Sequence, residues 1–263
     1  MTGSPGERLR SVLAATRRSG VVSTALAAAR RFGVAPHGFY YYYRARVRAP
    51  RGVAGVDPFR TLAVDPAEIE WLPKDRFDKW GDLGAVRGGE WDEPLLRFEE
   101  TPTYRTLHQR YEQGYEWEET ELYRSALSRL WRGKRGWQGT WTTSDLSARC
   151  EAVDDLYDRM RSEGYRSQTE LTGAATADRL RRGDFRRYES EVSVHVARDG
   201  SLRFVDGRHR LAIAKLLGLD AVTVQPVVRH RRWQAHRRRV AENGIDAVAA
   251  ELREHPDLAD VRN

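Results

Sequence analysis

The chain has 263 residues, of which 40% are apolar and 32% are charged, and its formal net charge is +7. This composition supports a folded domain with additions and excludes a chain that is disordered throughout. No run of 18 apolar residues occurs, which excludes a membrane-spanning helix, and the single cysteine, Cys150, excludes an internal disulfide. A lone cysteine is typical of the reducing cytoplasm, where we expect this protein.

Arginine supplies most of the positive charge, and its distribution along the chain is uneven. Among the 45 basic residues only four are lysine, namely Lys74, Lys79, Lys134 and Lys215, and residues 1–60 hold eleven arginines. A basic stripe suits nucleic acid, an anionic lipid surface or a phosphorylated ligand. A solvated arginine-rich surface explains the same pattern, so charge alone does not identify a partner.

The N-terminal region, residues 1–56, is expected to be a basic segment outside the main domain. Apolar spacing predicts an amphipathic helix over residues 7–32, and the Pro- and Gly-rich stretch 49–58 is typical of a linker. Between them, the aromatic block 39–43 indicates either a strand or a connecting helix. The main domain is therefore expected to begin near Asp57.

The rest of the chain alternates helical and strand patterns, which predicts an α+β fold. The turn-rich segment 73–100 contains Asp82, Glu90 and Asp92, which are candidate metal ligands or general bases unless the segment is simply a structural loop. The patterns beyond it predict helices over 103–132, divided near Gly114, and over 151–163, a polar connector over 168–183, strands over 192–196, 202–204 and 222–228, and helices over 211–217, 230–240 and 245–254.

The most informative stretch is Val205-Asp-Gly-Arg-His-Arg, which joins a predicted strand to a predicted helix. A glycine turn at a helix start presents unpaired backbone N–H groups at the positive end of the helix dipole, and this arrangement favours an anion. Arg208, His209 and Arg210 would add side-chain donors around it. Asp206 would cap the helix, pair with Arg210 or face a metal ion.

The same stretch, from Phe204 to Arg210, resembles the signature turn of the ParB/sulfiredoxin superfamily. The segments 62–69, 152–165 and 216–224 also resemble, in order, the opening strand, the helix leading to a glycine and the closing strand of that superfamily. Sulfiredoxins have their reactive cysteine, and the chromosome-partition members a glutamate, at the position that Arg208 occupies here. The Asp-Gly-x-His-Arg form is similar to that of the small free-serine kinases built on this fold.

This resemblance implies a ParB/sulfiredoxin-like domain over residues 57–240, with an insertion at about 73–148. A C-terminal helix and acidic tail would follow over 241–263. It also implies that a nucleoside di- or triphosphate, accompanied by Mg²⁺, binds at the turn, with phosphotransferase or nucleotide hydrolase activity as the possible reaction. The residues implied are Gly207, Arg208, His209 and Arg210 for binding, and Asp206 and His209 for catalysis.

A second interpretation stays open, in which the chain is a nucleic-acid-binding module. The basic stretch 229–239 would then contact phosphates through Arg229, Arg231, Arg232, Arg237 and Arg238. No histidine pair has the spacing of a zinc site, so we expect no metal held by side chains alone. His195, His230 and His236 are expected to face solvent.

Overall fold

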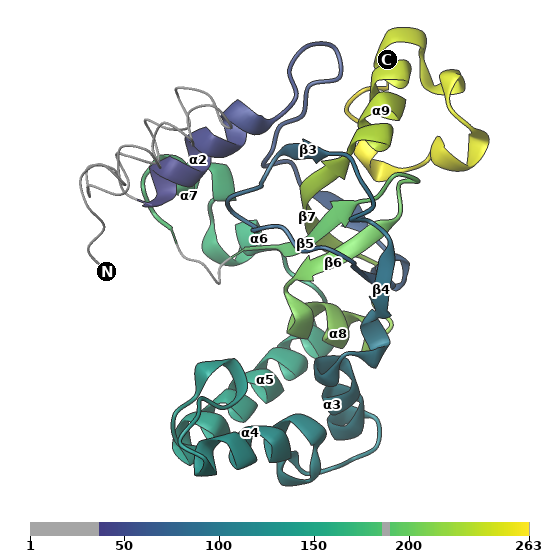
Figure 1. The fold of residues 1–263 in the computed structure, drawn as a ribbon. Coiled ribbons are helices and arrows are strands. Elements are labelled where there is room, and N and C mark those ends of the chain that lie inside the picture. Colours follow the sequence, from purple (N-terminus) through teal and green to yellow (C-terminus); the bar gives the residue numbers. More distant parts are fainter. Residues whose placement is uncertain (1–36, 186–189, 263) are drawn as a thin grey trace.

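The computed structural model describes residues 37–185 and 190–262, which form a mixed α+β fold around a seven-stranded sheet. The strands run in the order β1-β7-β5-β6-β2-β4, and β3 pairs with β7 (Figure 1). This confirms the predicted α+β class. The strands are β1 (Leu62–Val64), β2 (Trp71–Pro73), β3 (Ala85–Arg87), β4 (Pro94–Arg97), β5 (Val192–Val196), β6 (Leu202–Asp206) and β7 (Val222–His230).

Helices surround the sheet in three groups (Figure 1). Helices α3, α4 and α5 gather at one end of the molecule, with α8 between them and the sheet, whereas α9 lies at the opposite end. Helix α2 lies beside α7 at one side of the sheet. The helices are α2 (His37–Arg48), α3 (Pro102–Tyr111), α4 (Glu121–Trp131), α5 (Thr143–Glu163), α6 (Gln168–Thr172), α7 (Thr176–Arg181), α8 (Arg208–Leu216) and α9 (Arg231–Asn243).

The centre of the sheet is formed by β5 and β7, which pair in parallel with Val192 opposite Val224. All five residues of β5 are buried, as is usual for a strand that has paired neighbours and packing on both faces. Strand β6 returns antiparallel to β5 through a turn at Gly200, whose φ of 91° suits glycine. The strands predicted over 192–196 and 202–204 are confirmed, although β6 continues to Asp206. The prediction that His195 faces solvent is wrong, because its side chain is fully buried within β5.

The segment 73–100 contributes to the sheet instead of forming only a loop. Strand β3 pairs in parallel with the end of β7, and β4 pairs antiparallel with β2. Strand β7 therefore runs to His230, two residues further than predicted. His230 is buried and accepts a hydrogen bond from the Arg232 N–H as the N-cap of α9, so the prediction that it faces solvent is also wrong.

The helical lobe, helices α3 to α5, packs on α8 through Leu107, Leu146 and Leu211, none of which has exposed surface. Helices α3 and α4 are separate, as the break at Gly114 predicts. Helix α5 begins at Thr143 instead of residue 151, because Thr142 and Asp145 form a reciprocal capping box. Cys150 is therefore in mid-helix, and burial raises the pKa of its thiol to about 12, which makes it unreactive.

The aromatic block 39–43 is helical and belongs to α2, in agreement with one of its two predicted conformations. Ala45 on this helix is fully buried in a second, smaller core cluster that also holds Trp80, Leu83 and Val228. Helix α2 thus packs against the folded body. The helix predicted over residues 7–32 lies outside the described residues.

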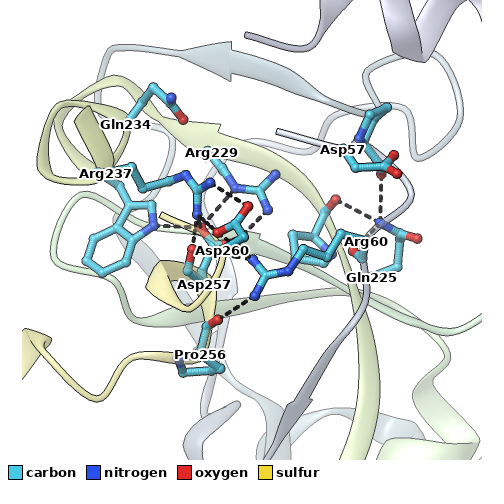
Figure 2. A network of polar contacts seen from close by, with 12 residues as sticks. Asp57, Arg60, Gln225, Arg229, Gln234, Arg237, Pro256, Asp257 and Asp260 are labelled. Atoms are coloured by element: carbon cyan, nitrogen blue, oxygen red, sulfur yellow. Dashed lines mark hydrogen bonds and ion pairs between the residues drawn. The ribbon is translucent and has the colours of Figure 1, made fainter. Parts of the chain in front are cut away.

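At the end of the molecule opposite the helical lobe, a buried ionic network connects the C-terminal segment to α9 and β7 (Figure 2). Asp257 has no exposed surface and accepts two hydrogen bonds from Arg229, at 2.5 and 2.9 Å. Arg237, also fully buried, donates to Asp257 and Asp260. The helix predicted over 245–254 is wrong, because this stretch forms short 3₁₀ turns that lead to Asp257.

Candidate functional site

The turn between β6 and α8 has the backbone geometry of an anion site. Gly207 has a φ of 92°, and a Cβ there would lie 3.0 Å from the Cα of Val192, so only glycine fits. Gly207 is also the N-cap of α8, and no side chain caps this helix. The first N–H groups of α8 therefore have no intrahelical acceptor, and they lie at the positive end of the helix dipole.

This turn forms part of the wall of a cleft of about 1540 Å³. Residues 205–210 line it from the sheet side, Arg149 lines it from α5, and Tyr41 from α2. The cleft thus lies where the sheet, the helical lobe and α2 approach one another. It is larger than the roughly 300–1,000 Å³ of most small-molecule sites, so it has room for a ligand of several connected groups.

Two arginines in the cleft have no carboxylate partner among the residues that the structure describes. Arg208, the first residue of α8, is exposed and forms no hydrogen bond or ion pair there, although its charge helps to lower the pKa of the neighbouring Asp206 carboxyl. Arg149 is half-buried, its Nε is buried without a hydrogen-bond partner, and burial lowers the pKa of its guanidinium. A partly buried cation without a counter-ion is costly, and an anionic ligand would remove that cost.

His209 lies between these two arginines as a neutral donor. Burial, reinforced by the charges of Arg149 and Arg208, lowers the pKa of its imidazole to about 3. Its Nδ1 is 3.4 Å from Gln138 Nε2 and 3.4 Å from Arg149 Nη2, and both of these atoms are donors. Nδ1 must therefore accept, which assigns the ring proton to Nε2. The Nε2–H is buried and has no acceptor in the described structure.

Gln138 is held in an unusual conformation to make this contact. Its φ of 51° is the one positive value among the described residues other than glycine. A left-handed conformation is uncommon for a residue with a Cβ and costs about 1–3 kcal/mol, so the surrounding contacts must hold it. Beside it, the Trp137 ring lies 5.4 Å from the His209 ring and 5.8 Å from the Arg149 guanidinium. The loop before α5 thus reaches the turn and fixes the orientation of His209.

Asp206 and Arg210 have partners inside the protein. Asp206 Oδ2 is 3.0 Å from Lys79 Nζ, and its Oδ1 accepts the Gly207 N–H. Burial favours the protonated form of Asp206, but Lys79 and this N–H outweigh it and lower the pKa of the carboxyl. Arg210 donates to the Ser190 carbonyl and lies 3.8 Å from Glu191, although its Nη1 has no hydrogen-bond partner. Of the alternatives for Asp206, the structure thus shows an ion pair, with Lys79 instead of Arg210.

The structure brings all five predicted residues, Asp206 to Arg210, to the cleft, and it adds three that sequence analysis missed. These are Lys79, Arg149 and Gln138. One signal in the sequence pointed to Lys79, since a lysine is rare in a chain whose basic residues are nearly all arginine. Arg149 and Gln138 gave no comparable signal.

The nucleic-acid interpretation loses part of its basic surface. Arg229 and Arg237 are 2% and 0% exposed, and Asp257 neutralises both, so the prediction that they contact a ligand is wrong. Arg231, Arg232 and Arg238 are exposed on α9. The exposed basic surface on α9 therefore contains three of the five predicted arginines.

The carboxylates of segment 73–100 serve in ion pairs. Asp82 pairs with Arg48 and Arg87. Asp92 is buried, which opposes its ionisation, but hydrogen bonds from Arg198 lower its pKa to about 2. Glu90 pairs with the same arginine. All three carboxylates thus pair with arginines, which agrees with the interpretation of this segment as a structural loop.

Within residues 37–185 and 190–262, no three His, Cys, Asp or Glu side chains cluster as metal ligands, and no helix is both long and apolar enough to cross a bilayer. The resemblance of the 204–210 turn to the ParB/sulfiredoxin superfamily stays a prediction from the sequence. No protein-family model, curated protein or solved structure matches the chain.

Proposed function

We propose that this chain binds the phosphate groups of a nucleoside di- or triphosphate in the cleft, at the turn that joins β6 to α8. The observation that carries the proposal is the set of unsatisfied donors there. The uncapped start of α8, the Arg149 and Arg208 guanidiniums without carboxylate partners, and the buried His209 Nε2–H border one cleft. Backbone N–H groups with arginine side chains are the groups that bind phosphate in proteins.

The resemblance to the ParB/sulfiredoxin superfamily supports the same conclusion independently of the geometry, because it predicts a nucleotide-phosphate site at these residues. The residues of the cleft suit charge stabilisation: cationic and neutral donors around a phosphoryl group stabilise the charge of its transfer. A phosphotransferase or nucleotide hydrolase activity is part of the proposal, with a hydroxyl or water as the acceptor. Asp206, the carboxylate next to the turn, remains the candidate catalytic residue.

The proposal also predicts how Mg²⁺ would be bound. Both carboxylate oxygens of Asp206 already accept hydrogen bonds, from Lys79 and from the Gly207 N–H. Asp206 is the single carboxylate within residues 205–210, it is paired with Lys79, and no cluster of metal ligands occurs among the described residues, so we expect the ion to arrive bound to the nucleotide phosphates, with little help from side chains. Mg²⁺ should then change affinity only modestly, and the protein should show no Mg²⁺ binding by itself.

Calorimetric titration of ATP, ADP, CTP and GTP, with and without Mg²⁺, tests the proposal. Arg208→Ala removes an exposed side chain that holds no part of the fold, and we expect it to weaken binding by about ten- to a hundredfold, the loss of one charge-assisted hydrogen bond. Arg231→Ala is the matched control, because Arg231 is also exposed and also the first residue of a helix, but outside the cleft.

Absence of binding by all four nucleotides, or equal loss in both variants, would refute the proposal. The Arg231 variant also tests the alternative. If the chain binds DNA or RNA with a steep salt dependence that Arg231→Ala reduces, and binds no nucleotide, then the nucleic-acid interpretation is correct.

A further inference from the structure

Three aromatic side chains form a second feature of the cleft, apart from its cationic end. Tyr41, Trp80 and Phe185 come from α2, from the segment before β3 and from the chain after α7, and all three line the cleft. We call them the aromatic cluster. Their ring centroids are 4.8 Å apart for Tyr41 and Phe185, 5.3 Å for Trp80 and Phe185, and 6.0 Å for Tyr41 and Trp80.

The aromatic cluster adjoins the turn through one residue. Lys79 Nζ lies 3.0 Å from Asp206 Oδ2 and 5.7 Å from the centroid of the Trp80 ring. Beyond Lys79, the aromatic cluster is therefore the next feature of the cleft for a ligand whose phosphates lie at the start of α8. The volume of the cleft leaves room for more than the phosphates alone.

The arrangement of the rings indicates what kind of group they receive. The three rings touch one another, so they leave no space between them for a cation. An aromatic cage for a quaternary ammonium group requires such a space. Tyr41 and Phe185 are half-buried. Their remaining surface faces a cleft, and a planar group can stack on it.

We propose that the aromatic cluster is the subsite for the base of the nucleotide, an inference that rests on the proposed function. The base stacks on Tyr41 and Phe185 while the phosphates bind at the turn. Stacking is tolerant of base identity because every base has a π-face, so the cleft should prefer nucleotides over inorganic polyphosphate more strongly than it prefers one nucleotide over another.

The test compares ATP with inorganic triphosphate by calorimetry, in wild type, Tyr41→Leu and Phe185→Leu. Tyr43→Leu is the matched control, because Tyr43 lies on the same helix but is 47% exposed and outside the cleft. We expect wild type to bind ATP at least about tenfold more tightly than triphosphate, because stacking of a base on an aromatic side chain has an effect of this size in other proteins. The two cleft variants should lose that preference while their affinity for triphosphate stays unchanged, and Tyr43→Leu should keep it.

The outcomes separate this inference from the function on which it rests. If triphosphate and ATP bind equally well to wild type, the phosphate site stands and the base subsite is refuted. If Tyr41→Leu and Phe185→Leu weaken both ligands equally, the aromatic cluster supports the fold only, and the base subsite is again refuted. If neither ligand binds, both proposals fail.

Discussion

His195→Phe tests the consequences of burying a histidine that has no hydrogen bond within residues 37–185 and 190–262. His195 has no exposed surface, its ring lies 5.4 Å from the rings of both Phe77 and Trp91, and neither ring nitrogen has a partner among the described residues. Burial lowers the pKa of His195 from 6.5 to about 3. The imidazole is therefore neutral in the folded protein and can become protonated easily only when the chain unfolds.

The sign and size of the effect follow from that difference. Between pH 6.5 and 3 the unfolded chain binds a proton at His195 that the folded protein does not bind, so the free energy of unfolding falls as the pH falls through this window. For each pH unit below 6.5 the free energy of unfolding decreases by about 1.36 kcal/mol, so the loss is about 2 kcal/mol at pH 5. Above pH 6.5 this contribution is absent, because both states are neutral at this position.

Urea denaturation of wild type and His195→Phe at pH 7 and at pH 5 measures the effect. A phenyl ring keeps the packing against Phe77 and Trp91 and binds no proton. We expect the loss of unfolding free energy between pH 7 and pH 5 to be about 2 kcal/mol smaller in the variant than in wild type. An equal loss in the two proteins would show that His195 is not a buried neutral histidine.

Two further substitutions test the ionic network around Asp257 and the contact between Gln138 and His209. Asp257→Asn leaves Arg229 buried without a counter-ion and Arg237 with Asp260 as its remaining carboxylate, so we expect urea denaturation to show a loss of about 3–5 kcal/mol, and a loss below about 1 kcal/mol would contradict the network. Gln138→Glu places a carboxylate beside His209 Nδ1, which should raise the pKa of His209 by about one to three units in an NMR titration. An unchanged pKa would mean that Gln138 does not contact the ring.

The elements that sequence analysis predicted best are those that depend on neighbouring residues. Strands β5 and β6 and the glycine turn that precedes α8 all follow from local conformational preferences, and the structure has each of them, although α8 begins at Arg208, three residues before the predicted residue 211. The same local signals located the turn as a candidate site. Because five consecutive residues form that turn, their proximity requires no knowledge of the fold.

Predictions failed where tertiary contacts override a local pattern. Ser193 and His195 alternate with valines in β5, which is the pattern of a strand with one face in water. The structure instead buries both residues completely, since β6 and β7 flank the strand and other elements cover both faces. Similarly, Lys79 reaches Asp206 from 127 positions away in the chain, a distance over which periodicity carries no information.

The arginines show most clearly why a basic sequence does not by itself identify a binding surface. The stretch 229–239 contains six arginines and no acidic residue, but Asp257 and Asp260 of the C-terminal segment neutralise Arg229 and Arg237. Arg149 has no arginine beside it in the sequence, and the structure leaves it half-buried with no carboxylate partner among the residues that it describes. A half-buried cation without a counter-ion raises the energy of the ligand-free protein, and binding an anion relieves that cost. The position of unneutralised, partly buried charge therefore points to the cleft, although local charge density points to α9.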